Sequence, residues 1–248
     1  ELRRLHDAPE PLVLVNAWDA ASARTVASAP GCRAIATASW SIAAANGYPD
    51  GEAIPREAML AAIATVASAV ELPVTADLER GFGHAGLTVA AAIEAGAVGC
   101  NLEDSTGTGD LWPAAEHAAV VAAARAAADA AGVPIVINAR TDVFLEGVGG
   151  VDEAVERGRA YLEAGADVIF VPGVTDVSTL EALAAGIGPI SVLGVPGGPT
   201  LAEYARIGVK RVSYGPGPMG VAMAALKRAA ETLLAGGEPP ADLAFRPT

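Results

Sequence analysis

Side chains able to bind a cation and an anion follow several short apolar runs of this 248-residue chain. Asp77 and Glu79 follow one such run, Glu103 follows the next, and Arg140 follows the one after that. Three carboxylates in one cleft repel each other strongly unless a cation lies between them. Ligand sets made only of oxygen suit Mg²⁺, and Mn²⁺ is the common alternative. These residues therefore predict a metal site of Asp77, Glu79 and Glu103.

Arg140 adds an anion-binding group to this predicted site. Its planar guanidinium has the geometry to hold a carboxylate or a phosphate in two-point contact. A metal and an arginine that face one cavity imply a small anionic substrate with a carbonyl or enolate oxygen, on which the metal would hold the developing charge. Each acid taken singly is more typical of a helix cap or an ion pair, so the functional interpretation depends on the combination.

The elements that position these residues alternate along the chain between apolar strand-like runs and alanine-rich helix-like runs. The stretches EAGAVGCNLE, EAGADVIFVP and RIGVKRVSYG repeat one pattern, in which a glycine ends a helix and the chain turns directly into a buried strand. We expect strands at residues 12–16, 33–37, 73–77, 97–102, 134–138, 167–171, 189–192 and 210–213. We expect helices at residues 55–70, 87–95, 113–131, 151–164, 178–185, 200–207 and 219–235, with a helix after Asp19 and a long loop from 38 to 51.

About eight β–α units in a chain of this length predict an α/β protein with a closed (β/α)8 TIM barrel, in one domain over residues 1–248. The alternative, an open doubly wound sheet, would normally carry G-x-G-x-x-G after its first strand, where this chain has NAWD. A barrel gathers its active site at the carboxyl ends of the strands. The polar residues expected there are Asn16, Asp19, Thr37, Ser39, Trp40, Ser41, Asp77, Glu79, Asn101, Glu103, Asp104, Asn138, Arg140, Asp142, Ser213 and Tyr214.

Composition excludes several classes of function. The 16 basic and 29 acidic residues give a formal net charge of −13, which argues against nucleic acid or an anionic membrane surface as a partner. An apolar fraction of 52% is too high for a disordered chain, yet charges, glycines and prolines interrupt every long apolar run, so no membrane span is expected. Two cysteines exclude a disulfide scaffold, and the first residues have no apolar signal core. We therefore expect a cytoplasmic protein.

At the predicted site residues the chain resembles the isocitrate lyase and phosphoenolpyruvate mutase superfamily. The matching stretches run in family order across most of the chain: VNAWD at 15–19, TASWS at 37–41, GYPD at 47–50, VTADLERGFG at 74–83, NLED at 101–104, NARTD at 138–142 and VKRVSYGP at 209–216. The resemblance implies a (β/α)8 barrel, Mg²⁺, and chemistry on a small 2-oxo or 2-hydroxy carboxylate. It also implies a homodimer or homotetramer, in which the last helix is often exchanged between subunits.

The resemblance also implies roles for individual residues. Asp77 is similar to the principal Mg²⁺ ligand, whereas Glu79 and Glu103 match acids that act through metal-bound waters. Asp50 matches an acid that orients these waters or the substrate, and Arg140 resembles the anion-binding arginine of the fifth strand.

The substrate cradle of the superfamily is matched by Ser39 with the backbone of Trp40 and Ser41. Many members carry glycine where Trp40 stands, and the bulk of this side chain would narrow the pocket. Asn138, at the end of the fifth strand, and Trp18, expected at the mouth of the barrel, complete the set of predicted substrate-binding residues.

The loop after the fourth strand departs from the superfamily pattern. Lyases of the superfamily carry Lys-Arg-Cys-Gly-His there, and the mutase carries a lysine, whereas this chain reads DSTGTGD at 104–110. The missing proton carrier argues against a classical isocitrate or methylisocitrate lyase and against the mutase. The glycine-rich segment 105–110 is either a mobile lid or a plain turn, and His84 is either a substrate contact or a solvated loop histidine.

Decarboxylation of an oxaloacetate-like 2-oxo acid needs the fewest additional catalytic groups, because the enolate is the only developing charge and the metal stabilises it. Cleavage of a 2-hydroxy acid needs a base, for which Tyr48, Asp50 or a metal-bound hydroxide are candidates. We therefore expect a Mg²⁺-dependent carbon–carbon lyase or decarboxylase. The alternatives are a 2-oxo acid binding protein with little turnover and a phosphonopyruvate-type carbon–phosphorus hydrolase.

Overall fold

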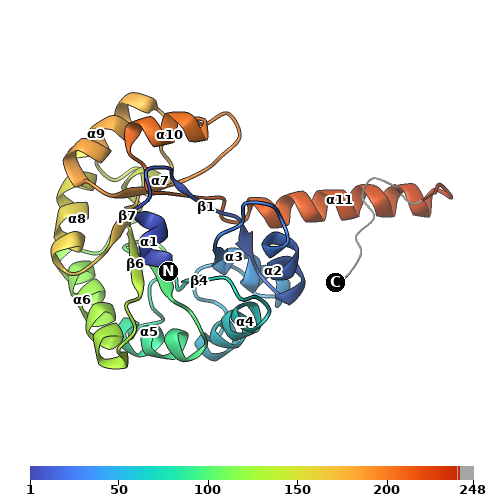
Figure 1. The fold of residues 1–248 in the computed structure, drawn as a ribbon, viewed down its shortest axis with the longest axis horizontal. Coiled ribbons are helices and arrows are strands. Elements are labelled where there is room, and N and C mark those ends of the chain that lie inside the picture. The colour runs from blue at the N-terminus through green and yellow to red at the C-terminus, as the bar shows by residue number, and fades with distance from the viewer. Residues whose placement is uncertain (239, 241–248) are drawn as a thin grey trace.

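Nine parallel strands form one sheet in the computed structural model, which describes residues 1–238 and 240. They are β1 (Leu12–Leu14), β2 (Asn16–Ala17), β3 (Ile35–Thr37), β4 (Val74–Asp77), β5 (Gly99–Glu103), β6 (Val136–Arg140), β7 (Val168–Phe170), β8 (Ile190–Leu193) and β9 (Arg211–Ser213). β1 pairs with β9, β2 pairs with β3, and only Val15 separates β1 from β2. The first two strands are therefore two halves of one barrel strand, and the sheet closes as the (β/α)8 barrel that the sequence predicted (Figure 1).

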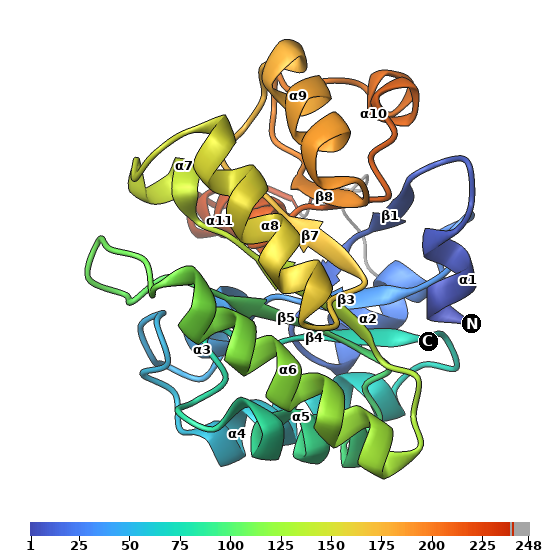
Figure 2. The same ribbon diagram turned by 90° about the vertical axis from the view of Figure 1, so that its left-hand side faces the viewer.

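Most helices surround the barrel on the outside, as Figures 1 and 2 show, whereas α1 lies across one end of it. The helices are α1 (Leu2–His6), α2 (Ala20–Ala27), α3 (Ser39–Ala45), α4 (Arg56–Ser68), α5 (Ala85–Glu94), α6 (Ala114–Ala131), α7 (Val143–Glu146), α8 (Val151–Glu163), α9 (Val177–Ile187), α10 (Leu201–Ile207) and α11 (Gly217–Leu234). α11 differs from the other helices, because it leaves the barrel and projects away from it (Figure 1).

Local sequence explains where these helices begin and end. Asp19 accepts the amide of Ser22 at 2.7 Å and forms a capping box at the start of α2. Gly96 and Gly165, each just past a helix, have φ angles of 97° and 109°, which glycine adopts without steric cost. The expected loop over 38–51 is wrong in its first half, because residues Ser39–Ala45 form α3. Its buried Ile42 and Ala43 belong to an apolar cluster that includes residues of α4, and this packing stabilises a segment too short to show a helical repeat.

The apolar core has two layers, one inside the barrel and one between the strands and the surrounding helices. Inside the barrel, Leu12, Leu14, Val136 and Val168 pack together, and Leu2 and Leu5 of α1 join them. A larger cluster lies between the strands and the helices and includes residues of α4, α5, α6, α8 and α9. The strands are thus held by apolar packing on both faces of the sheet, on the inner face with the help of α1. Among the described residues, no helix is long and apolar enough to cross a membrane.

His117 of α6 is a buried histidine in the outer layer, and it makes the stability of the protein dependent on pH. It is 1% exposed, and its ring packs edge-on against Tyr161 with the centroids 4.7 Å apart. Burial lowers the pKa of His117 from 6.5 to about 4. Between these two values the unfolded chain binds a proton that the folded chain excludes, so this contribution to stability is complete above pH 6.5 and is lost as the pH falls toward 4.

We expect the variant His117→Phe to lose less stability than the wild type between pH 7 and pH 5. Below pH 6.5, the free energy of unfolding of the wild type should fall more steeply with pH than that of the variant, by up to about 1.4 kcal/mol per pH unit. Urea unfolding at each pH measures both free energies. His84→Phe is the matched control, because His84 is exposed and should leave the pH dependence unchanged. Identical slopes for His117→Phe and the wild type would contradict the prediction.

Candidate active site

Asp77 ends β4 and is fixed by residues from the end of β3 and the start of α3. Its Oδ2 accepts the Ser39 amide at 3.1 Å and the Ser39 hydroxyl at 2.9 Å. Its own amide donates to the Thr37 hydroxyl oxygen at 2.9 Å. The sequence predicted Ser39 as part of a substrate cradle, and the structure gives this side chain a further partner, the principal predicted metal ligand.

Glu79 lies two residues beyond Asp77 and is held by a loop that precedes α4. Its Oε2 accepts the amide of Glu52 at 2.5 Å, and the Glu52 carboxylate accepts the amides of Arg80 at 3.1 Å and Phe82 at 2.7 Å. We call this reciprocal contact the Glu52–Glu79 clasp. Glu52, Glu79 and Phe82 are the non-glycine residues with positive φ in the described chain, and all three lie in the clasp. Backbone in this region costs of order 1 kcal/mol per residue, and such residues cluster at functional sites.

Glu103, at the end of β5, lies between two arginines. Its Oε2 is 2.8 Å from Nη1 of Arg140, and its Oε1 is 3.7 Å from Nη1 of Arg80. Arg140 also donates from Nε to Asp142 at 2.6 Å, and its guanidinium lies 5.8 Å from the centre of the Phe170 ring. A guanidinium has five N–H donors, so these contacts leave donors for a substrate anion.

The carboxylates of this cluster influence each other's protonation. Burial, followed by the charge of Asp77, raises the pKa of Glu79 to about 7, and the charge of Asp50 adds to the effect. Burial also raises the pKa of Glu103, against the opposing influence of Arg140, and Asp142, Asp77 and Glu79 contribute in the same direction as burial. The acids of β4 and β5 therefore form one electrostatic unit, as the sequence suggested.

The donor set of this unit is suited to Mg²⁺. Every candidate ligand is an oxygen, and Oε1 of Glu79 is buried without a hydrogen-bond partner among the described residues. In the part of the chain that the structure describes, no three Asp, Glu, His or Cys side chains are arranged to coordinate one ion directly. An ion in this cluster would accordingly have fewer than three direct protein ligands among the described residues. A cavity of about 290 Å³ beside Glu103 is bordered by Glu52, Arg80 and Trp112.

Some predicted substrate-binding residues lie apart from the carboxylates. Asn138 is fully buried in the barrel, where its amide donates to Asn101 at 2.8 Å and its oxygen accepts from Ser191 at 2.7 Å. Trp18 borders a different groove of about 380 Å³, between α2 and the start of α11. These two positions give no geometric support to a role in substrate binding.

The other predicted residues lie at the rim of the site. Trp40 is in the first turn of α3 and is 45% exposed, and Ser41 next to it is buried with a hydroxyl that has no partner in the described chain. Tyr48, 39% exposed, and Asp50 are on the exposed loop that follows α3. Both side chains are open to solvent, and the charge of Asp50 is among those that raise the pKa of Glu79.

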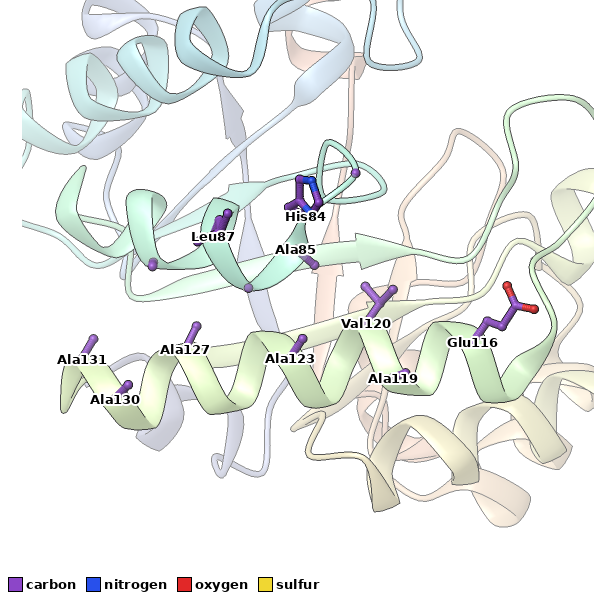
Figure 3. Close-up of a pocket in the computed structure, with 13 residues that line it drawn as sticks. His84, Ala85, Leu87, Glu116, Ala119, Val120, Ala123, Ala127, Ala130 and Ala131 are labelled. Atoms are coloured by element: carbon purple, nitrogen blue, oxygen red, sulfur yellow. The ribbon is translucent and has the colours of Figure 1, made fainter.

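The segment 105–110 is a hairpin-like loop in which Ser105 pairs with Leu111. The backbone of Thr106 donates to Asp110 at 2.9 Å, so the loop has internal order. His84 is exposed and borders a groove of about 770 Å³ between α5 and α6 (Figure 3). The rest of that groove consists mostly of alanine and glycine, which supports the interpretation of His84 as a solvated loop residue.

Two residues of the site had no role assigned from sequence. Glu52 follows Gly51 in a loop that has no periodic pattern, and its partner Glu79 is 27 residues away. Arg80 belongs to the stretch that carries the family resemblance, and it lies between Glu52 and Glu103. Its position directly after two predicted metal ligands was the only available signal.

Comparison with known proteins finds similar chains over most of the sequence. Residues 2–234 match the phosphoenolpyruvate phosphomutase family. The chain is 34% identical to 2-methylisocitrate lyase of Escherichia coli (strain K12) over 179 residues, which cover 68% of this chain and 60% of that one. A crystal structure from Burkholderia cenocepacia J2315, provisionally described as a phosphonomutase, has 48% identity and a TM-score of 0.88, and the match covers 93% of this chain and 97% of that one.

The structure of oxaloacetate acetylhydrolase in complex with the inhibitor 3,3-difluorooxalacetate is also similar. It has 26% identity and a TM-score of 0.89, and the match covers 98% of this chain and 89% of that one. Fold, family profile and identity over most of the chain therefore agree with the resemblance found in the sequence. The chain belongs to the phosphoenolpyruvate phosphomutase family, within the superfamily of isocitrate lyase and phosphoenolpyruvate mutase.

Proposed function

We propose that this protein is a Mg²⁺-dependent carbon–carbon lyase or decarboxylase that acts on a small 2-oxo or 2-hydroxy carboxylate of the oxaloacetate type. The observation that carries the proposal is the cluster of Asp77, Glu79 and Glu103 next to the guanidinium of Arg140. The superfamily includes lyases and mutases, which supports an enzymatic role. The similar oxaloacetate acetylhydrolase binds the inhibitor 3,3-difluorooxalacetate, and this supports an oxaloacetate-like substrate class.

Each group has a distinct task in this proposal. Asp77 would hold Mg²⁺, or Mn²⁺, and Glu79 and Glu103 would hold its waters. When bound, the metal would polarise a substrate carbonyl oxygen and offset the negative charge that develops there. Arg140 binds a substrate carboxylate through the donors that Glu103 and Asp142 leave, and Ser39 fixes the rotamer of Asp77.

The segment 105–110 supports decarboxylation over reactions that need a protein acid at this position. Asp110 is its only ionisable residue. Release of carbon dioxide from a 2-oxo acid needs an electron sink and no proton abstraction. A second candidate, hydrolysis of a carbon–phosphorus bond, is favoured by the similarity to the Burkholderia protein described as a phosphonomutase.

A turnover assay with metal removal tests the proposal. The protein is treated with EDTA, then assayed with oxaloacetate and with phosphonopyruvate, before and after Mg²⁺ is restored. We expect pyruvate from oxaloacetate only after Mg²⁺ is restored, at a rate above that of a matched Mg²⁺ blank, because free Mg²⁺ also promotes this decarboxylation. Phosphate from phosphonopyruvate would favour the second candidate. Tight binding of oxalate in calorimetry, with no product from any substrate, would favour a 2-oxo acid binding protein.

We also propose that the protein is a homodimer or homotetramer held together by α11. This helix projects from the barrel and carries the exposed apolar residues Val221, Met223 and Leu226, of which Val221 and Leu226 are 73% and 61% exposed (Figure 1). Isolated apolar helix faces of this kind are normally covered. The groove that contains Trp18 is also lined by Pro218 and Ala222 at the start of α11, so the barrel offers a place beside this helix, and a second copy of the chain is the expected partner.

The variant Leu226→Asp should shift the protein from an oligomer toward a monomer in light scattering after size-exclusion chromatography. A charge placed in an apolar interface costs several kcal/mol because it is buried without a partner. Leu201→Asp, at an exposed leucine of α10, is the control and should leave the mass unchanged. A monomeric wild type would refute the proposal directly.

A further inference from the structure

α8, on the outside of the barrel, contacts the acid that directly follows Glu103 in the sequence. Asp104 is fully buried, and its Oδ2 accepts the Tyr161 hydroxyl at 2.7 Å. Nη1 of Arg157, one turn earlier on α8, lies 3.2 Å from the same oxygen. Arg157 is itself tied to Glu153 at 2.7 Å. One carboxylate oxygen of Asp104, an acid outside the predicted metal cluster, is thus paired by two side chains of one peripheral helix.

From Asp104, hydrogen bonds lead directly to Arg140. The other carboxylate oxygen of Asp104 accepts the amide of Asp142 at 2.9 Å, and the amide of Asp104 donates to the carbonyl oxygen of Arg140 at 3.2 Å. Asp142 in turn accepts Nε of Arg140 at 2.6 Å. The direction of the guanidinium therefore depends on Asp142, and the position of Asp142 depends on Asp104.

The same group closes the neck of the loop between β5 and α6. The amide of Trp112 donates to the carbonyl oxygen of Asp104 at 2.8 Å, and Nη1 of Arg157 donates to the carbonyl oxygen of Trp112 at 2.8 Å. Arg157 thus contacts both ends of the segment that contains the glycine-rich residues 105–110. The buried guanidinium of Arg157 therefore fixes the base of this loop, and through Asp104 it also fixes the position of the loop relative to the end of β6.

We propose that Tyr161 and Arg157 are positioning residues that act through Asp104: they set the direction of Arg140 toward its anion and hold the neck of the 104–112 loop. The choice of anion rests on the proposed function, whereas the positioning rests on the hydrogen bonds alone. Groups that orient a ligand-binding side chain usually change affinity by about 10- to 100-fold when they are removed.

The variant Tyr161→Phe tests this role, because it deletes one hydroxyl and keeps the ring that packs on His117. Tyr204→Phe is a matched control, since Tyr204 is also buried and its hydroxyl has no partner in the described chain. We expect Tyr161→Phe to weaken the binding of oxalate, measured by calorimetry with Mg²⁺ present, by about tenfold. Tyr204→Phe should bind oxalate as the wild type does.

Hydrogen exchange gives a second readout that does not depend on the proposed function. In Tyr161→Phe the amides of Asp142 and Trp112 should exchange faster than in the wild type, with no such change in Tyr204→Phe. If the wild type fails to bind oxalate, the proposed function fails, and the exchange rates still decide the positioning role. If both variants match the wild type in affinity and exchange, the positioning role is wrong. Arg157→Lys, which keeps the charge and loses the planar fork, repeats the test should Tyr161→Phe not fold.

Discussion

Replacing Asp77 with asparagine is expected to reduce metal-dependent turnover by a factor of about a thousand or more while the fold survives. A bound metal stabilises the developing charge by several kcal/mol, and each 1.36 kcal/mol corresponds to about tenfold in rate. The asparagine oxygen can still accept from the Ser39 amide and hydroxyl, so the local hydrogen bonds are largely kept. Steady-state kinetics with oxaloacetate, together with calorimetric titration of Mn²⁺, measure the two consequences.

Asp129→Asn is the matched control for this substitution. Asp129 is an exposed residue near the end of α6, so its loss of charge should change neither turnover nor metal affinity. The Asp77→Asn protein with Mg²⁺ also supplies the correct blank for decarboxylation by free metal. Turnover of Asp77→Asn equal to that of the wild type would remove Asp77 from the mechanism.

Replacing Arg140 with methionine is expected to affect both activity and stability. The variant loses the two-point anion contact, and activity should fall at least about a hundredfold because the substrate is no longer held in a reactive orientation. Glu103 and Asp142, whose side chains are 12% and 2% exposed, lose their nearest cation. Removing one partner from a buried ion pair typically costs about 3–5 kcal/mol. Urea unfolding and steady-state kinetics measure these two effects.

Two further variants separate the contributions of Arg140. Arg140→Lys keeps the charge near Glu103 and loses the planar fork, so stability should recover more than activity does. Arg206→Met removes an ion pair with Glu181 whose side chains are 60% and 46% exposed, and it should cost at most about 1 kcal/mol. An Arg140→Met protein that turns over substrate normally would show that another residue binds the anion.

The sequence predicted the barrel and the edge on which its polar residues gather. Alternating strand and helix runs, and glycines such as Gly96 and Gly165, have local causes that act within a few residues. In a closed parallel sheet, all strands end at the same side, so Asp77, Glu103 and Arg140 had to converge once the strands were assigned. The division of the first strand into β1 and β2 was not visible, because it depends on pairing with β9 on one side and β3 on the other.

Partner choice within the site could not be predicted in the same way. Asn138 and Arg140 are both polar residues at the end of β6. The side chain of Asn138 is hydrogen-bonded to Asn101 and Ser191 inside the barrel, whereas Arg140 forms an ion pair with Glu103. The Glu52–Glu79 clasp joins two loops through residues in left-handed backbone conformations, which propensities disfavour. The bonds from α8 to Asp104 join residues 53 and 57 positions apart.

By itself, then, the amino-acid sequence determined a (β/α)8 barrel and the acidic and basic residues at the mouth of that barrel, because strand periodicity, glycine helix ends and side-chain type are local properties. Only the tertiary structure decided that Ser39 fixes Asp77, that Glu52 holds Glu79, and that Tyr161 of an outer helix reaches Asp104. These contacts depend on how helices and loops pack against the finished barrel, and packing places side chains from distant parts of the chain within hydrogen-bond distance.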